Sequence, residues 1–237
     1  MQPKVEIMKI LAIGDPLRVA ALRKRLESTG FEIDFSDGDR EESYEEYDVI
    51  FDMNFDDDAE NLPLYASLRN KFVFVSAAKQ SLNEAVYTTD AKIKCKLFGI
   101  NAIPEFVTNE VWEVSAYRKF EIPDLHNLAK VLGLQVVMVE DRVGLVKPRI
   151  IFMIINEACY TLQEGTAGIE EIDLGMKLGT NYPYGPFEWC DRIGITNVFE
   201  TLMSLYDDTR DERYRVCPLL KTKYLRNELF YKPPKEK

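Results

Sequence analysis

The hydrophobic pattern of the chain changes near residue 144, and this change separates two kinds of fold. Before it, short apolar runs rich in β-branched and aromatic residues alternate with stretches of helical periodicity. Runs of this kind are typical of strands buried on both faces of a parallel sheet. They occupy residues 10–13, 31–36, 49–51, 72–75, 111–114 and 136–139.

Between the runs, apolar residues recur at helical spacing in 17–28, which Gly30 follows, and in 123–132, which Gly133 follows. A glycine readily adopts the left-handed backbone that ends a helix, so both segments are predicted to be helices. Alternating strands and helices predict a doubly wound α/β domain with a shortened, Rossmann-like parallel sheet. We expect this domain to span residues 1–143.

From Gly144 onward the strand pattern is missing and helical patterns follow one another, separated by glycine and proline. They cover residues 149–164, 169–178, 197–207 and 219–225. We therefore expect residues 144–237 to form a second, all-helical domain.

Composition argues against several classes of protein. A net charge of −10 does not suit a nucleic-acid partner, which needs clustered lysine and arginine. No apolar run approaches the ~20 residues of a membrane span, and the N-terminus lacks the pattern of a signal peptide. The four cysteines form no C-x-x-C pair and have no histidine beside them. We predict no metal site, and we expect buried free thiols in a cytoplasmic protein.

A nucleotide-binding loop is only weakly marked between the first strand and the first helix. Of the three glycines of a G-x-G-x-x-G loop, Gly14 alone is present, while Pro16 and Val19 hold the other two positions. Pro16 also removes an amide N–H that a phosphate would use. Asp37, 23 residues after Gly14, either accepts hydrogen bonds from an adenine ribose or belongs to an exposed acidic turn. We expect weak binding of NAD at this loop.

The second half of the chain carries a more specific signature. Residues 178–188 read L-G-T-N-Y-P-Y-G-P-F-E, with Gly165 and Asp173 before them. Further matching positions are Gly144, Arg149, Asn156, Glu157, Ala158, Tyr214, Arg215 and residues 218–221. This pattern resembles the helical C-terminal domain of 3-hydroxyacyl-CoA dehydrogenases. The resemblance implies NAD-dependent oxidation of 3-hydroxyacyl-CoA to 3-ketoacyl-CoA in fatty-acid metabolism, an acyl-CoA ligand, and a homodimer formed through the helical domain.

The resemblance also assigns candidate site residues in the first half. Glu113 falls on the glutamate of the family's catalytic His–Glu pair, but the histidine position is Asn101. A carboxamide has no basic nitrogen near neutral pH, so Asn101 cannot act as a general base. Ser76 keeps a family serine, whereas Lys79 takes the place of the substrate-binding serine. Asp52 takes the place of a family glutamate at the end of its strand.

Other family features are altered. Two asparagines of the active site correspond to Pro104 and Pro148. The helical hairpin that contacts CoA is replaced by the nine residues 38–46, a length that suits a turn. These changes favour a dehydrogenase-like protein with impaired or no activity. The alternatives are a non-catalytic dimeric binding or regulatory protein, and a different reaction in a remodelled cleft.

Several residues admit a plainer interpretation. Asp56, Asp57 and Asp58 are interpreted as a solvated loop, and the single histidine, His126, as a surface residue. Lys79 is interpreted as a solvated lysine, and the alternatives are that it replaces a lost charge partner or contacts a phosphate of acyl-CoA. The aromatic residues of the signature are interpreted as core or interface residues in preference to a ligand cage. They are Tyr182, Tyr184, Phe187 and Trp189.

Overall fold

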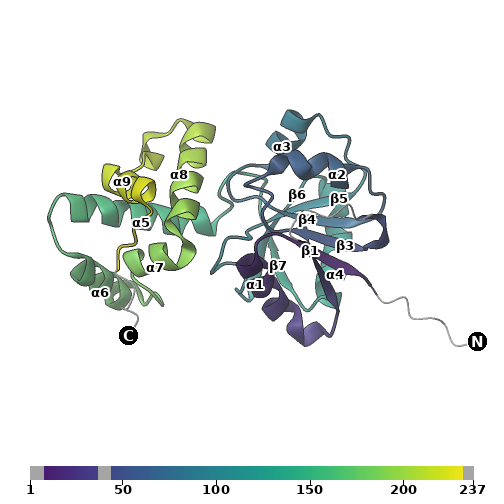
Figure 1. The fold of residues 1–237 in the computed structure, drawn as a ribbon, viewed down its shortest axis with the longest axis horizontal. Helices are drawn as coiled ribbons and strands as arrows, with labels where there is room; N and C mark the ends of the chain where they lie inside the picture. The colour runs from purple at the N-terminus through teal and green to yellow at the C-terminus, as the bar shows by residue number, and fades with distance from the viewer. Residues whose placement is uncertain (1–7, 37–43, 232–237) are drawn as a thin grey trace, which may run out of the picture. The chain divides into compact units, whose positions relative to one another are not determined.

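A computed structural model describes residues 8–36 and 44–231 (Figure 1). Contacts divide the chain into two compact units, Met1–Leu145 and Val146–Lys237. The first unit contains the sheet and the second is helical, as the change of pattern predicted.

Within the described residues, the first unit forms one sheet of seven strands in the order β2-β1-β3-β4-β5-β6-β7. The strands are β1 (Ile10–Ile13), β2 (Ile33–Ser36), β3 (Val49–Asp52), β4 (Phe72–Ser76), β5 (Lys96–Ile100), β6 (Val111–Ala116) and β7 (Gln135–Met138). All neighbours are parallel except β5 and β6. The expected α/β sheet is confirmed, but β5 was missed because Lys96 and Gly99 interrupt its apolar run.

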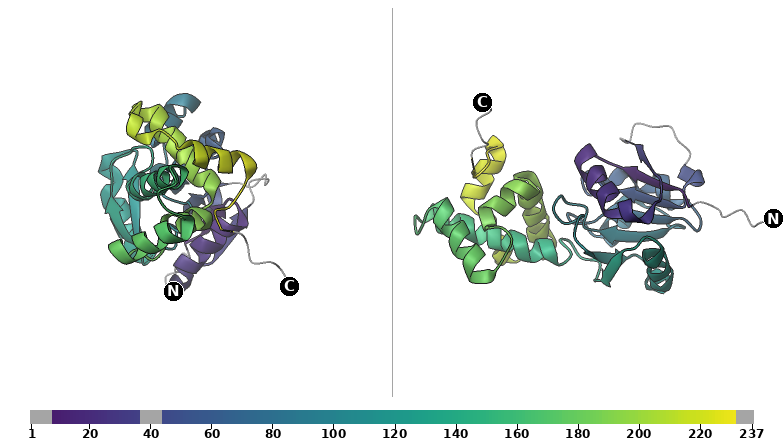
Figure 2. Two further views of the ribbon diagram at one scale, coloured as in Figure 1. Left: turned by 90° about the vertical axis from the view of Figure 1, so that its left-hand side faces the viewer. Right: turned by 90° about the horizontal axis from the view of Figure 1, so that it is seen from below.

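Helices cover both faces of the sheet (Figures 1 and 2). The helices α1 (Pro16–Leu26) and α4 (Ile122–Val131) pack on one face, while α2 (Leu62–Ala66) and α3 (Leu82–Thr89) pack on the other. The first core includes Val19, Leu22 and Leu26 of α1. Their helical spacing matches the periodicity read from the sequence.

The strand order places a topological switch point between β1 and β3. β1 continues through α1 to β2 on one side, while β3 continues through α2 to β4 on the other. In open α/β sheets, ligands bind outside the carboxyl ends of the strands at such a point. A ligand site is therefore expected at the carboxyl ends of β1 and β3.

The second unit contains the helices α5 (Lys147–Gln163), α6 (Ile169–Thr180), α7 (Pro186–Ile193), α8 (Ile195–Thr209) and α9 (Pro218–Arg226). Its core is built from the apolar stripes of α5, α7 and α8. The fully buried members include Phe152, Ile155, Phe187, Val198, Leu202 and Leu205.

The signature residues of this unit hold helices together. The buried Asp173 of α6 accepts hydrogen bonds from the backbone N–H of Phe187 and of Glu188, at 2.8 and 2.9 Å, and from the hydroxyl of Tyr231. It thereby satisfies the open amides at the start of α7. A Cβ on Gly185 would lie 2.5 Å from the Cα of Asp173. Glycine is required there because the two backbones meet.

Asn156 of α5 has a similar structural role. Its Oδ1 accepts the N–H of Cys217 at 2.8 Å, and its Nδ2 donates to the carbonyl of Arg215 at 2.9 Å. The buried amide thus fixes the segment that leads into α9, and both of its polar atoms are paired. Arg149 donates to the hydroxyl of Tyr214 in the same segment.

Candidate functional site

The sequence-predicted site residues of the first unit gather at the carboxyl edge of the sheet. Gly14 follows β1, Asp52 ends β3, Ser76 ends β4 and Asn101 follows β5. β6 runs antiparallel to β5 with Val114 opposite Ile100, so Glu113 lies beside Asn101 in register. Asp37 lies outside the described residues.

The N-terminus of α1 is occupied by a carboxylate of the protein itself. Asp15 Oδ1 accepts the backbone N–H groups of Leu17 and Arg18 at 2.9 and 3.0 Å. The preceding helical position is Pro16, which has no N–H. In a dinucleotide-binding turn these amides and the positive end of the helix dipole hold the pyrophosphate. Here Asp15 supplies the negative charge instead.

The turn after β3 closes the other side of the switch point. The side-chain oxygen of Asn54 accepts the N–H of Asp15 at 3.2 Å. A Cβ on Gly14 would come within 2.8 Å of that oxygen and 3.0 Å of Met53 Cβ. Glycine is therefore needed at position 14 because the backbone there packs closely against Met53 and Asn54 of the turn after β3. The residues at this turn do not fit the pyrophosphate of a dinucleotide.

An ion-pair network lies beside this turn. It corrects the interpretation of the acidic run as a solvated loop for Asp56, whereas Asp57 and Asp58 are exposed as expected. The Arg18 side chain, 5% exposed, pairs with Asp56 at 3.2 Å and with Asp57 at 3.1 Å, and it donates to the carbonyl of Met53. The Asp56 side chain is fully buried. Lys79 is also buried and pairs with Asp57, so the interpretation as a solvated lysine is wrong.

Two carboxyl groups of this region have raised pKa values. Burial raises the pKa of Asp52 to about 7, although hydrogen bonds from Tyr65 Oη, at 2.9 Å, and from the N–H of Asn54 act in the opposite direction. Burial also raises the pKa of Asp56, and the positive charge of Arg18 opposes that rise. Both groups face protein atoms, and Asp52 is 1% exposed.

At the position of the family's catalytic histidine the chain has Asn101, whose buried side-chain amide has a fixed orientation. Asn101 Oδ1 accepts the N–H of Ile103 at 3.3 Å. Since an N–H can bond only to the oxygen of the amide, Nδ2 points away from that contact and has no hydrogen-bond partner within the described residues. Glu113 and Ser76 are buried nearby in β6 and β4. Together these groups can bind a polar ligand atom, but Asn101 cannot take up a proton.

The sequence did not predict three further residues at the carboxyl edge of the sheet, Arg18, Asn54 and Tyr65, which form hydrogen bonds there. Arg18 and Asp56 are separated by 38 residues, and no local pattern links an arginine in one helix with an acidic turn after a later strand. The remaining interpretations hold where the structure tests them. His126 is exposed, and all four cysteines are buried free thiols.

The aromatic residues of the signature divide between core and surface. Phe187 is fully buried, while Tyr182 and Tyr184 are half-buried beside Trp189, with ring centroids 5.4 and 6.3 Å from its ring. Arg192 lies over the Tyr184 ring at 4.1 Å.

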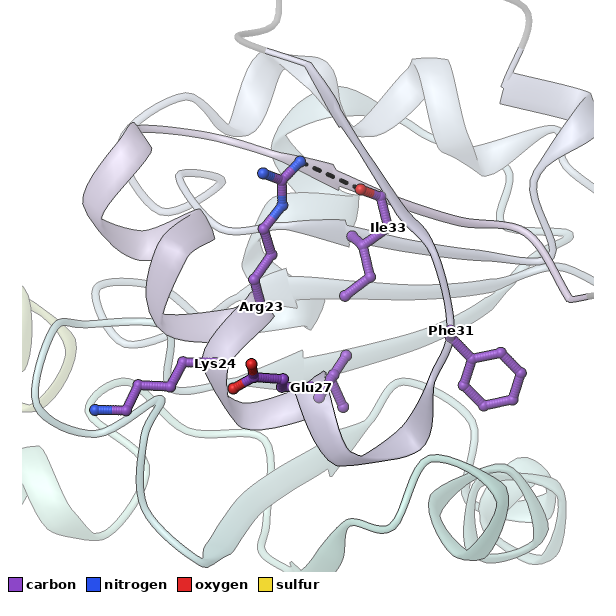
Figure 3. Close-up of a pocket in the computed structure, with 6 residues that line it drawn as sticks. Arg23, Lys24, Glu27, Phe31 and Ile33 are labelled. Carbon is purple, nitrogen blue, oxygen red and sulfur yellow. Dashed lines mark hydrogen bonds between the residues drawn. The ribbon is translucent and has the colours of Figure 1, made fainter.

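Cavities lie away from the carboxyl edge, and one of about 380 Å³ is lined by residues that include Glu45, Arg69 and Lys71. Two others lie on helices. One, of about 320 Å³, lies at the C-terminal end of α1, where Arg23 donates to the carbonyl of Ile33 (Figure 3). The other, of about 360 Å³, is an apolar groove between α5 and α6 of the helical unit, and Ile154, Ile172 and Met176 are among its lining residues. Within the described ranges, no cluster of His, Cys, Asp or Glu is arranged to hold a metal ion.

Comparison with known proteins identifies the relatives of the chain. Residues 144–236 match the family model of the 3-hydroxyacyl-CoA dehydrogenase C-terminal domain. A 3-hydroxybutyryl-CoA dehydrogenase of Bradyrhizobium diazoefficiens is 44% identical over 89 residues, which are 38% of this chain and 30% of that protein. The chain belongs to the 3-hydroxyacyl-CoA dehydrogenase family. Its resemblance to the family's signature is thus confirmed.

The similarity extends into the first unit at lower identity. A 3-hydroxybutyryl-CoA dehydrogenase of Clostridioides difficile is 30% identical over 183 residues, 76% of this chain and 64% of that protein. The matched segments therefore span less than two thirds of the lengths of these two curated relatives. The crystal structure of (S)-3-hydroxybutyryl-CoA dehydrogenase from Ralstonia eutropha has the same fold, with a TM-score of 0.71 and 20% identity over 94% of this chain and 95% of that chain.

Proposed function

We propose that this protein keeps the fold of the 3-hydroxyacyl-CoA dehydrogenases but does not perform their NAD-dependent oxidation. The observation that carries the proposal is the carboxylate of Asp15 on the amides of Leu17 and Arg18. A pyrophosphate would have to displace Asp15 and would meet its negative charge at the helix end. The proposal therefore concerns binding of the cofactor before it concerns the chemical step.

The histidine position supports the same proposal independently. The resemblance implies that this histidine removes the proton of the substrate's 3-hydroxyl group while hydride leaves C3. Asn101 has no basic nitrogen to offer, and its oxygen already accepts the N–H of Ile103. Loss of a positioned base slows a reaction by about 10²–10⁴-fold. Cofactor binding and proton transfer are thus both impaired.

The test is a calorimetric titration of the purified protein with NADH, followed by a spectrophotometric assay with acetoacetyl-CoA and NADH at 340 nm. The 3-hydroxybutyryl-CoA dehydrogenase of Clostridioides difficile serves as the positive control. We expect no saturable binding at millimolar NADH and no oxidation above background. Micromolar binding of NADH together with turnover of acetoacetyl-CoA would refute the proposal.

The role that we propose instead is a non-catalytic homodimeric binding protein in the cytoplasm, with an acyl-CoA as its ligand. The helical unit supports association because two large apolar side chains of α6, Leu174 and Leu178, are 58% and 77% exposed. Exposed apolar patches of this kind mark interaction surfaces. Among the described helices, none has the length and apolar character needed to cross a bilayer.

Association and ligand binding can be tested separately. Light scattering after size-exclusion chromatography should give a dimer for the natural protein and a monomer for Leu178→Lys. Lys221→Glu, a charge change at an exposed position of α9, is the control and should remain dimeric. Calorimetry with acetoacetyl-CoA in the absence of NADH tests the ligand. A monomeric natural protein, or no heat with the acyl-CoA, would remove the corresponding part of the proposal.

A further inference from the structure

One side of α6 is exposed and apolar, where a surface helix is usually polar. The residues of this side recur at positions i, i+3, i+4, i+7 and i+8, so they lie in line along the helix. They are Glu171, Leu174, Gly175, Leu178 and Gly179, called here the α6 stripe, and all are exposed. The stripe therefore presents two large apolar side chains next to two positions that have no side chain.

The glycines of the stripe have no structural reason within the chain. Neither Gly175 nor Gly179 has the positive φ that favours glycine. A Cβ built at either position would meet no atom of a neighbouring segment within 4 Å among the described residues. At Gly185, by contrast, a Cβ would lie 2.5 Å from the Cα of Asp173. Glycine weakens a helix relative to alanine, so these two glycines indicate the close approach of a backbone from outside the chain.

The apolar groove between α5 and α6, called here the α5–α6 groove, lies beside the stripe. Gly175 lines it together with Ile172 and Met176, and its volume is about 360 Å³. Successive residues are about 100° apart around a helix, so the groove residues lie on one side of Gly175 and Leu174 and Leu178 lie on the other. The surface thus has a ridge and a recess on either side of one glycine.

A two-fold axis through Gly175 would make this surface complementary to itself. When two α6 helices cross antiparallel about such an axis, each residue lies opposite the one equally far beyond the axis. Leu178 and Ile172 are each three positions from Gly175, and Leu174 and Met176 are each one position from it. Each leucine of one copy therefore lies opposite a groove residue of the other copy.

The charges of α6 favour the same antiparallel arrangement. Its first turn carries Glu170 and Glu171, and its last turn carries Lys177, which also pairs with Glu188 of its own chain at 3.5 Å. An antiparallel partner brings the acidic end of one helix beside the basic end of the other. The groove is lined by Glu157 and Glu171, and these charges disfavour an anionic ligand such as a fatty acid.

We propose that a second copy of this chain binds the α6 stripe with its own α6, in an antiparallel crossing that places Gly175 at the two-fold axis. Leu174 and Leu178 of each copy then enter the α5–α6 groove of the other. The inference rests on the proposed homodimer and names the surface that forms it. The two exposed leucines, 58% and 77% accessible, leave water in both copies at once, and the glycines let the two backbones come close enough for this contact.

Disulfide trapping tests the position of the axis. A residue on a two-fold axis lies next to its own copy, and a disulfide needs two Cα atoms within about 7 Å. Gly175→Cys should therefore form a covalent dimer on oxidation with diamide, seen on a non-reducing gel. Lys221→Cys, at an exposed position of α9, is the control and should stay uncrosslinked. The four natural cysteines are buried and do not compete.

Gly175→Ala separates association from folding, because its effects on the two have opposite signs. The added methyl group overpacks the crossing, so the dissociation constant of the dimer in sedimentation should rise at least about tenfold. In the monomeric Leu178→Lys background the same change should raise the melting temperature by about 1–4 °C, since alanine favours a helix. Lys221→Ala should leave the dissociation constant unchanged.

The inference is overturned if the natural protein is dimeric and Gly175→Cys stays dimeric but uncrosslinked. An unchanged dissociation constant in Gly175→Ala, or a lower melting temperature of that variant in the Leu178→Lys background, has the same meaning. In each of these cases the homodimer of the proposed function still stands. A monomeric natural protein defeats both, whereas binding of NADH defeats the non-catalytic role and leaves this interface untouched.

A further variant decides the question if Gly175→Cys is itself monomeric. Ile172→Cys/Leu178→Cys places two thiols that should lie opposite each other across the axis, and oxidation should join them between copies. Within one helix these positions are about 9 Å apart along the axis, too far for a disulfide inside the chain. Absence of a covalent dimer in this variant would also overturn the inference.

Discussion

Removing the Arg18 guanidinium should destabilise the sheet unit strongly, because Asp56 would be left buried without its nearest cation. The Arg18 side chain is 5% exposed and the Asp56 side chain is 0% exposed. Breaking a buried ion pair by deleting one partner costs about 3–5 kcal/mol, since the remaining charge is neither hydrated nor paired. We expect Arg18→Met to lower the free energy of unfolding by this amount at pH 7.5.

The cost should depend on pH. Burial raises the pKa of Asp56, and Arg18 opposes that rise, so the pKa in Arg18→Met should be higher still. A group with a raised folded-state pKa favours folding below its unfolded pKa and loses that contribution as pH rises. The difference between Arg18→Met and the natural protein should therefore be small near pH 4 and grow toward pH 7.5.

Urea denaturation followed by circular dichroism at pH 4.5 and pH 7.5 gives these free energies. The double variant Arg18→Met/Asp56→Asn should recover about 1–3 kcal/mol at pH 7.5, the coupling expected for residues in contact. Lys24→Met, at an exposed position of the same helix, should change stability by less than about 0.5 kcal/mol. A cost of Arg18→Met below about 1 kcal/mol, or the same cost with Asp56→Asn present, would refute the buried-pair reasoning.

Three other substitutions test separate parts of the molecule. Gly185→Ala should destabilise the helical unit by about 3 kcal/mol in urea denaturation, because its Cβ would meet the Asp173 backbone; unchanged stability would contradict this packing. Asn101→His alone should give no oxidation of NADH by acetoacetyl-CoA, because Asp15 still occupies the α1 amides; measurable turnover would show that base loss was the main defect. Asp52→Asn should be more stable than the natural protein at pH 8 but not at pH 4, and a constant difference would contradict the raised pKa.

Local patterns predicted most of the strands and helices, and the missed elements have identifiable causes. β1, β3 and β4 are nearly continuous apolar runs, buried along most of their length. β5 contains Lys96 and Gly99, and its glycine is needed because a Cβ there would lie 2.8 Å from Ala77 Cβ. The antiparallel direction of β6 follows from the connection of residues 101–110, which contains no helix and returns the chain to the sheet at the end where β5 stops, so it could not be predicted without recognising β5.

The candidate site was predictable in position but not in its contacts. Asp52, Ser76, Asn101 and Glu113 reach one edge because each lies at or near the end of a strand that faces that edge. The partners of those residues come from other elements. Tyr65 belongs to α2, a helix of five residues whose periodicity is too short to recognise, so its bond to Asp52 could not be expected from sequence.

The family signature in this chain consists largely of residues that hold the helical unit together. Asp173 and Gly185 build the start of α7, and Asn156 ties α5 to the segment before α9. These contacts are required for folding whether or not any reaction takes place. A match to the signature therefore establishes the fold and the family, and it leaves the chemistry to the carboxyl edge of the sheet.

At that edge, the demands of a ligand and those of the protein compete for the same atoms. The amides of Leu17 and Arg18 have one donor each, and both are used by Asp15. A pyrophosphate could form these two hydrogen bonds only if the bonds to Asp15 were broken. The negative charges of the pyrophosphate and of Asp15 would then lie close together. Replacing Asp15 with serine keeps a helix cap but removes the charge. If Asp15→Ser binds NADH more tightly than the natural protein, charge repulsion is the barrier; if it does not, the missing N–H of Pro16 and the close packing at Gly14 are sufficient to exclude the pyrophosphate.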